Sequence, residues 1–351
     1  MWIIAAGQFI SCMTWDQEMI VMGRAQSALY TQDTEQYKVK SGMLSPLVFV
    51  YSRPGLEKIF SLYGHRLGVT SVDLDTRVIV SGSLDWTVRV WDRKSGTLIT
   101  CLQDHGDWVT GVHIKMMKDS SRLFTLGLDN IIHCYEINHP DELEDFDSVV
   151  TVNKKEQCRT VLEDNSFHLP INYKQPLKTY LKQCGCLATS DQYLISSYKT
   201  MIHVWRLEDT KIHSTLRGHA ELVGQLKVQN QLLISSGCEK TVMIWSLETM
   251  TCLHVLNYTD KFNNVSYPKI DLDHRYLLVT TSDHIDIWDT SSLWSHSAPV
   301  KVRSVPVEVL IVSVHLERRG IGFSCYKSVQ IMDFSNPDSR DSLFYGTSTK
   351  F

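Results

Sequence analysis

Two stretches of this chain repeat one spacing of histidine, acidic residue and tryptophan, and this repeat constrains the fold more than any other feature. Trp91 lies 26 residues after His65, and Trp245 lies 26 residues after His219. An acidic residue stands six positions before each tryptophan. Segments bounded by turn signals, such as residues 47–51, alternate apolar and polar residues as β-strands do. Repeated units of this kind stack side by side to bury a shared core.

Residues 64–92 resemble a WD repeat, the unit that forms one blade of a β-propeller. The marks are Gly-His at 64–65, Ser-Gly-Ser-Leu-Asp at 81–85 and Trp-Asp at 91–92. Residues 218–245 resemble a second repeat, and weaker matches extend from about residue 9 to residue 334. WD repeats are about 40 to 45 residues long, so the length of the chain suits one closed ring. The resemblance implies an all-β fold, a single seven-bladed WD40-type β-propeller.

The domain organisation follows from where the repeat pattern holds and where it stops. We expect residues 1–338 to form the propeller, with long insertions at about 24–46 and 138–178, and residues 339–351 to form a polar tail. The strand at residues 2–5 could pair with the last blade and close the ring, which removes exposed sheet edges. Residues 149–152 could supply the outer strand of the third blade. The rest of 138–178 is either a solvated loop or a partner-docking segment.

The resemblance implies a buried chain of hydrogen bonds in the blades that match the repeat best. An indole N–H, a hydroxyl, an imidazole and a carboxylate can satisfy one another in series, as buried polar groups require. We assign three such sets, which are His65, Ser81, Asp85 and Trp91; His105, Thr125, Asp129 and Tyr135; and His219, Ser235, Glu239 and Trp245. At the corresponding acidic position of another blade stands Lys199, so the chain should be broken there. Catalysis by these residues is not expected, since no separate nucleophile turn accompanies them.

The turns between the second and third strands of each blade should lie beside the loops that carry the repeat histidines. In WD-repeat propellers this face is the usual binding surface. The candidate partner-binding residues are Arg24, Arg66, Trp86, Trp108, Lys199, Lys240, His284 and Lys327. The seven turn positions carry four basic residues and no acidic one, and these seven are Arg24, Trp86, Asn130, Lys199, Lys240, His284 and Lys327. In the whole chain, by contrast, acidic residues outnumber basic ones 39 to 35. Such a rim suits an acidic or phosphorylated peptide, although solvated lysines and arginines are also ordinary in turns.

Composition and missing motifs argue against several other classes of protein. The net charge of −4 argues against a nucleic-acid partner, which usually requires a clustered basic excess. No apolar run reaches the roughly 18 residues of a membrane span, and no secretory signal is recognisable. We therefore expect a cytoplasmic or nuclear protein with reduced cysteines. A phosphate-binding loop, a His-Glu-x-x-His motif and a Gly-x-Ser-x-Gly motif are all missing, so we expect no enzyme activity, no cofactor and no metal.

Two segments are similar to the propellers of F-box/WD-repeat proteins, namely residues 80–91 and residues 331–337. That family supplies substrate receptors for cullin-RING (SCF) ubiquitin ligases, in which the F-box binds an adaptor and the propeller holds a substrate. The resemblance implies a substrate-recognition propeller with an adaptor and a cullin as partners. Because strands begin almost at once, we expect the F-box itself to be missing from this sequence. The alternative is a general WD-repeat scaffold, monomeric within a signalling, trafficking or RNA-processing complex.

Overall fold

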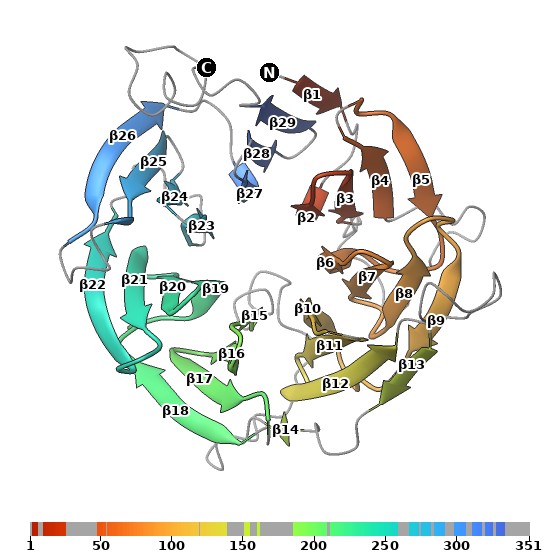
Figure 1. The fold of residues 1–351 in the computed structure, drawn as a ribbon, viewed down its shortest axis with the longest axis horizontal. Helices are drawn as coiled ribbons and strands as arrows, with labels where there is room; N and C mark the ends of the chain where they lie inside the picture. Colours follow the sequence, from red (N-terminus) through yellow and green to blue (C-terminus); the bar gives the residue numbers. More distant parts are fainter. Residues whose placement is uncertain are drawn as a thin grey trace, which may run out of the picture.

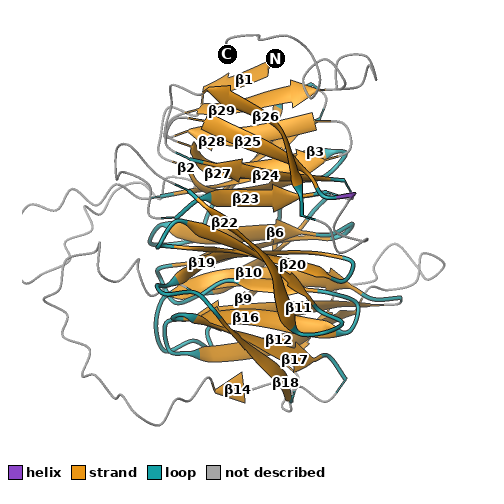
Figure 2. Cartoon of the chain, turned by 90° about the vertical axis from the view of Figure 1, so that its left-hand side faces the viewer, coloured by secondary structure: helices purple, strands orange, loops and turns teal. Residues whose placement is uncertain are grey.

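The computed structural model shows a ring of antiparallel β-sheets arranged radially around a central axis (Figure 1). Seen edge-on, the ring forms a disc, and the strands run across its thickness (Figure 2). The structure describes residues 2–5, 10–25, 48–53, 55–118, 120–138, 151–154, 160–161, 185–208, 211–258, 267–273, 275–281, 284–291, 298–306, 311–317, 320–325 and 328–333. Within these residues, no helix is long and apolar enough to cross a membrane.

Three blades of consecutive strands come from the first half of the chain. The first contains β2 (Ile10–Trp15), β3 (Met19–Arg24), β4 (Val48–Ser52) and β5 (Lys58–Leu62). The second contains β6 (Val69–Leu74), β7 (Val78–Ser83), β8 (Val88–Asp92) and β9 (Leu98–Leu102). The third contains β10 (Val109–Met116), β11 (Ser120–Gly127), β12 (Ile131–Asn138), β13 (Thr151–Lys154) and β14 (Thr160–Val161).

Three more blades of the same kind follow. The fourth contains β15 (Leu187–Thr189), β16 (Tyr193–Tyr198), β17 (Met201–Arg206) and β18 (Ile212–Arg217). The fifth contains β19 (Val223–Gln229), β20 (Leu232–Gly237), β21 (Thr241–Ser246) and β22 (Thr251–Asn257). The sixth contains β23 (Lys269–Leu272), β24 (Tyr276–Thr280), β25 (His284–Asp289) and β26 (Val300–Pro306).

The two ends of the chain share one further sheet, which we call the closing sheet. It combines β1 (Trp2–Ala5) with β27 (Ile311–Glu317), β28 (Gly320–Cys325) and β29 (Ser328–Asp333). The expected count of seven blades is thereby corrected. The described chain builds six blades from consecutive strands, and the closing sheet is a composite because β1 pairs antiparallel with β29. The expected pairing of residues 2–5 with the end of the ring is confirmed.

The apolar core lies between neighbouring sheets rather than within one of them. A single cluster joins Val21 and Val50 of the first blade to Val69, Ile79 and Trp91 of the second. Neighbouring sheets cover β7 on both faces, so all six of its residues are buried, and its two serines are hydrogen-bonded there. Full burial of a valine, leucine or isoleucine stabilises a fold by about 1.5–3 kcal/mol. Each blade therefore depends on its neighbours for most of its stability.

Close contact between blades restricts side-chain size on the central strands. A Cβ atom added to Gly82 on β7 would lie 2.7 Å from Cγ1 of Val109, the first residue of β10. Only glycine allows the two sheets to approach this closely.

The third blade does not end in the single outer strand that was expected within the 138–178 insertion. Its outer edge is formed by two short strands rather than one, because β13 pairs with the C-terminal half of β12 and β14 pairs with its beginning. The first of these strands spans Thr151–Lys154, slightly later than the expected 149–152. Residues 24–25 of the other expected insertion are described, whereas most of both insertions and the whole 339–351 tail lie outside the described residues.

Candidate functional site

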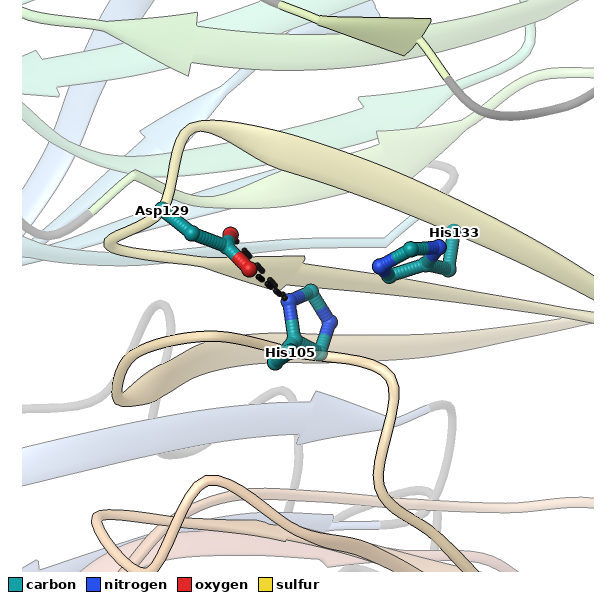
Figure 3. Close-up of side chains that lie close together, drawn as sticks. All are labelled: His105, Asp129 and His133. Carbon is teal, nitrogen blue, oxygen red and sulfur yellow. Dashed lines mark hydrogen bonds and ion pairs between the residues drawn. The ribbon is translucent and has the colours of Figure 1, made fainter.

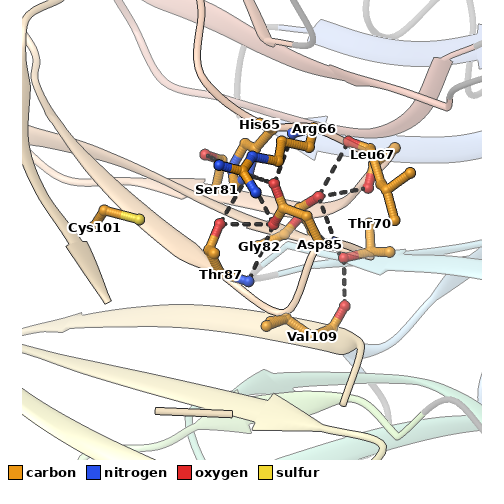
Figure 4. Close-up of polar contacts among 12 residues, drawn as sticks. His65, Arg66, Leu67, Thr70, Ser81, Gly82, Asp85, Thr87, Cys101 and Val109 are labelled. Atoms are coloured by element: carbon orange, nitrogen blue, oxygen red, sulfur yellow. Dashed lines mark hydrogen bonds and ion pairs between the residues drawn. The ribbon is translucent and has the colours of Figure 1, made fainter. Parts of the chain in front are cut away.

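The second blade contains a buried chain of four hydrogen-bonded side chains, of which Figure 4 shows His65, Ser81 and Asp85. Trp91 Nε1 donates to Ser81 Oγ at 3.0 Å, and Ser81 Oγ lies 2.8 Å from His65 Nε2. The other ring nitrogen, Nδ1, lies 3.0 Å from Oδ2 of Asp85. An indole can only donate, so the serine proton points to Nε2 and the imidazole carries its proton on Nδ1. Each donor of the chain, from the indole to the imidazole, therefore has an acceptor.

Asp85 links the loop that carries the repeat histidine to the turn between β7 and β8. It accepts hydrogen bonds from the backbone N of Arg66 at 2.8 Å and from Thr87 Oγ1 at 2.6 Å. Burial alone would raise the pKa of Asp85, but the hydrogen bonds from His65, Thr87 and the backbone of Arg66 hold the pKa well below its usual range. The ionised carboxylate thus fixes the position of Trp86, the next residue along the turn.

The fifth blade has the same chain with glutamate in place of aspartate. Trp245 Nε1 donates to Ser235 Oγ at 2.8 Å, and this oxygen lies 2.6 Å from His219 Nε2. Glu239 still reaches His219 Nδ1 and also accepts from Thr241 Oγ1 at 2.5 Å. Burial would raise the pKa of Glu239, but these two hydrogen bonds lower it. The extra methylene group is accommodated without loss of the bond to the imidazole.

The third blade keeps the histidine, hydroxyl and acid but not the fourth member. His105 Nε2 lies 2.8 Å from Thr125 Oγ1, and His105 Nδ1 lies 3.0 Å from Oδ2 of Asp129. The assignment of Tyr135 to this chain is wrong, since its hydroxyl donates to Asp104 Oδ2 at 2.7 Å. A phenol oxygen extends beyond the place of an indole N–H, and Asp104 stands where the other two repeats have glycine. The tyrosine therefore binds this carboxylate instead of the threonine.

The fourth blade keeps only one bond of the chain. Trp205 Nε1 donates to Ser196 Oγ at 2.9 Å. The turn between β16 and β17 contains Lys199 and has no acidic residue.

Serine, histidine and aspartate are arranged in the second blade as in a hydrolytic triad, but the serine has another role. The Ser81 side chain is fully buried and already accepts the indole hydrogen of Trp91. A substrate carbonyl cannot reach a nucleophile in this position. The geometry supports a structural role for the chain.

The turns between second and third strands share an uncommon backbone conformation. The left-handed φ angle is 70° at Trp86, 58° at Asn130, 52° at Lys199 and 67° at Lys240. Asparagine tolerates this region, whereas a bulky residue there is strained. Trp86 is also 46% exposed, so its indole extends from the turn into solvent. Strain and exposure together make this residue the most unusual of the four.

The other candidates on this surface differ in exposure. Arg66 and Lys199 are exposed, and Trp108, Lys240 and His284 are half-buried. We call this surface the turn face and define it by Arg24, Arg66, Trp86, Trp108, Lys199, Lys240 and His284. The remaining candidate, Lys327, lies outside the described residues.

Arg24 at the end of β3 carries a partly buried charge. Its Nε and Nη1 atoms are buried and make no hydrogen bond in the described structure, and burial lowers the pKa of the guanidinium. An anion bound there would satisfy these donors.

His133 is a polar residue of the third blade that the repeat pattern did not single out. It pairs across strands with Thr125, and its ring lies 4.6 Å from that of His105, edge to face. The position opposite the hydroxyl varies among blades, being Arg89, His203 and Met243 elsewhere. No repeat rule fixes this position, so only the register of β11 with β12 reveals its neighbour.

The radial sheets and the buried tryptophan–serine–histidine–acid chains define a β-propeller built from repeats of one kind. The model of the family "WD domain, G-beta repeat" matches residues 56–92, which contain the whole chain of the second blade. The matching family model, the WD-repeat relatives and the propeller fold together support the WD40 β-propeller family that the sequence resemblance predicted. Propellers of this family are suited to protein–protein interaction and generally serve as scaffolds without catalytic activity.

Several curated proteins are similar to this chain. Cell division control protein 4 of Saccharomyces cerevisiae is 22% identical over 289 residues, covering 80% of this chain and 30% of that protein. An F-box/WD-40 repeat-containing protein of Arabidopsis thaliana is 47% identical over 53 residues, or 15% of this chain and 10% of that protein. Nuclear distribution protein PAC1 of Saccharomyces cerevisiae is 23% identical over 239 residues, covering 62% of this chain. The matches span less than half the length of these relatives, at most 45%.

A solved structure titled "Crystal Structure of Mitotic Checkpoint Complex" contains a chain of similar fold. The TM-score is 0.64 at 11% identity, and the match covers 95% of this chain and 93% of that one. At this identity the similarity concerns the fold alone.

Proposed function

We propose that this propeller is the substrate-recognition part of an F-box-type (SCF) ubiquitin ligase and binds acidic or phosphorylated peptides on its turn face. The observation that carries the proposal is Trp86, a large indole that is 46% exposed on a backbone with φ of 70°. Strained backbone is found mainly where function requires it, and exposed aromatics are typical anchors of interfaces. A partner that covers the indole would offset the free-energy cost of the strained backbone and that of the exposed apolar surface.

Cationic side chains on the same surface support an anionic partner. Arg66 follows the repeat histidine directly, and its backbone N is held by Asp85 in the turn that carries Trp86. Arg24 offers buried guanidinium donors that a carboxylate or phosphate could accept from. Two acidic residues in neighbouring histidine loops, Asp107 and Glu221, limit the basic area to part of the turn face.

The ubiquitin-ligase part of the proposal draws on sequence similarity. The match of 47% identity to an F-box/WD-40 repeat-containing protein supports a common origin for 53 residues of the propeller. An adaptor and a cullin would then be partners of the complete assembly through an F-box. The cytoplasm and the nucleus are the compartments in which such an assembly would work.

Peptide binding in solution tests the peptide part of the proposal. Fluorescence anisotropy would compare a library of phosphorylated peptides with their unphosphorylated and basic counterparts, on the wild-type chain and on Trp86→Asn. We expect acidic or phosphorylated peptides to bind the wild type, more weakly as salt increases, and the variant to lose most of that affinity. Equal binding of basic peptides, or unchanged binding by the variant, would contradict the proposal.

A general WD-repeat scaffold is the second candidate function. Two relatives that match 62% and 66% of this chain are a nuclear distribution protein and periodic tryptophan protein 2 of Arabidopsis thaliana, and neither is named for an F-box. Affinity purification from cells, followed by mass spectrometry, distinguishes the two candidates. Recovery of a cullin and its adaptor supports the ligase, whereas a stable complex without them, lost in Trp86→Asn, supports the scaffold.

A further inference from the structure

Three potential metal ligands lie together in the third blade. One ligand atom each from His105, Asp129 and His133 lies within 4.8 Å of the other two (Figure 3). The residues come from the loop before β10, the turn between β11 and β12, and β12 itself. Two imidazoles and one carboxylate form a donor set that suits zinc and neighbouring divalent transition metals.

The proton on His105 is not fixed as it is in the other blades. In the second and fifth blades an indole N–H donates to the serine, so the proton of the imidazole must sit on Nδ1. In the third blade the Tyr135 hydroxyl donates to Asp104 and leaves Thr125 free to accept a proton from Nε2. His105 Nδ1 can then present its lone pair to a cation. The replacement of tryptophan by tyrosine thus makes this imidazole available as a ligand.

The surroundings of the three residues resemble the supporting shell of a metal site. Metal-bound histidines usually donate their second N–H to an acceptor, here Thr125 Oγ1 at 2.8 Å. Asp129 is oriented by the backbone N of Gly106 at 2.9 Å and by that of Ile131 at 3.1 Å. The His105 Nδ1 atom lies 3.0 Å from Asp129 Oδ2, a spacing that two ligands of one small cation can adopt.

The approach to this pair of ligands is kept open by a glycine. A Cβ atom added to Gly127 would come within 2.5 Å of His105 Nδ1 and 2.6 Å of Asp129 Oδ1. The second blade has Ser83 at this position. Asp129 is 11% exposed at the turn, whereas the two imidazoles are almost fully buried, so a cation would enter from the turn side.

We propose that His105, Asp129 and His133 bind one divalent transition-metal ion, with zinc as the best fit to the donor set. The ion replaces the hydrogen bond between His105 and Asp129, and small movements of the side chains bring the third ligand to coordination distance. Three protein ligands leave one position of a tetrahedral site for water or for an anionic group of a partner. The site is independent of the proposed peptide binding.

Cobalt(II) titration with visible absorption, followed by competition with zinc, tests the site on the full chain. His133→Met is the main variant, because Met243 occupies the same position in the fifth blade and methionine is not among the usual protein ligands of zinc. His203→Met is the matched control, because His203 is the equivalent residue of the fourth blade, outside the cluster. Asp129→Asn is a second variant that keeps an acceptor for His105 but removes the negative charge. Circular dichroism checks that each variant is folded.

We expect the wild type and His203→Met to bind one equivalent of cobalt with the absorption of a tetrahedral site, which zinc then displaces. His133→Met and Asp129→Asn should lose the absorption and bind zinc at least about tenfold more weakly. No absorption in the wild type, equal loss in the His203→Met control, or unchanged binding by folded His133→Met and Asp129→Asn would each overturn the proposal.

Discussion

Trp86 and Asn130 occupy the same turn position in neighbouring blades, and both have a left-handed backbone, with φ of 70° and 58°. Asparagine is one of the few residues other than glycine that adopts this region readily. The conformation follows from the turn and does not change with the residue. Trp86 is therefore tolerated at this position rather than favoured by it.

Replacement of Trp86 by asparagine should stabilise the propeller and weaken partner binding at the same time. Relief of the backbone strain predicts an increase of about 1 kcal/mol in the free energy of unfolding, which chemical denaturation would measure. Lys240→Asn is the control, because lysine at the equivalent φ of 67° is less strained and should gain less. A loss of stability in Trp86→Asn would show that the indole packs on the fold itself.

Ser81→Ala should destabilise the protein about twice as much as Ser196→Ala. The first change leaves both the Trp91 indole and one nitrogen of His65 without partners, whereas the second leaves only the Trp205 indole. Each buried group that loses its hydrogen bond costs about 1–3 kcal/mol. Thermal and chemical unfolding of the two variants would give the ratio, and equal costs would contradict a cooperative chain in the second blade.

Acid should destabilise the protein through its repeat carboxylates. The folded-state pKa values of Asp85, Asp129 and Glu239 are below their usual range, because hydrogen bonds to these side chains outweigh the effect of burial. Their contribution to stability is complete above the unfolded pKa values, near 4, and is lost as the pH falls through the folded values. Unfolding free energies measured from pH 7 to pH 3 should decrease in the acid range. Asp85→Asn should flatten this decrease, and an unchanged slope would argue against the assignment.

Arg93→Met should weaken the contact between the first two blades. Arg93 is buried beyond the end of β8, where Nη1 donates to the backbone O of Asp75 at 2.6 Å and pairs with Asp16, while Nη2 donates to Glu18 at 3.0 Å. The lost bond to a buried carbonyl predicts a cost of about 1–3 kcal/mol. Glu18→Gln should cost less than about 1 kcal/mol, because Glu18 is 77% exposed. Similar losses of stability in the two variants would show that the ion pair between Arg93 and the exposed Glu18, rather than the bond to the buried carbonyl, stabilises this contact.

The repeat, and most of the fold that it determines, could be predicted from the sequence. The spacing from His65 to Trp91 predicted the propeller class, since four residue types at fixed positions satisfy one another only when three strands pair in one register. The pairing of the first strand with the end of the ring was also readable from its apolar character. The division of the third outer strand into β13 and β14 was not, because it depends on which segments happen to reach β12.

The chemistry of the third blade was the hardest part to predict. Comparison with the repeat pattern treated two substitutions separately, namely Tyr135 in place of tryptophan and Asp104 in place of glycine. Their direct bond depends on both substitutions together, and a pattern that scores positions separately does not contain it. His133 was missed for a related reason, because the repeat does not fix the residue opposite the hydroxyl. These departures from the repeat mark the places where the third blade differs from the second and fifth.

The closing sheet also determines how the molecule responds to mechanical force. Trp2 lies opposite Ile331 and Ala5 lies opposite Ser328, so the N-terminal end of β1 lies beside the C-terminal end of β29. Tension applied between the two ends of the chain would load the hydrogen bonds one after another, beginning at Trp2, rather than all at once in shear. Because four residue pairs join the first and last strands of the described chain, the ring would open there by peeling while the six blades of consecutive strands are still intact.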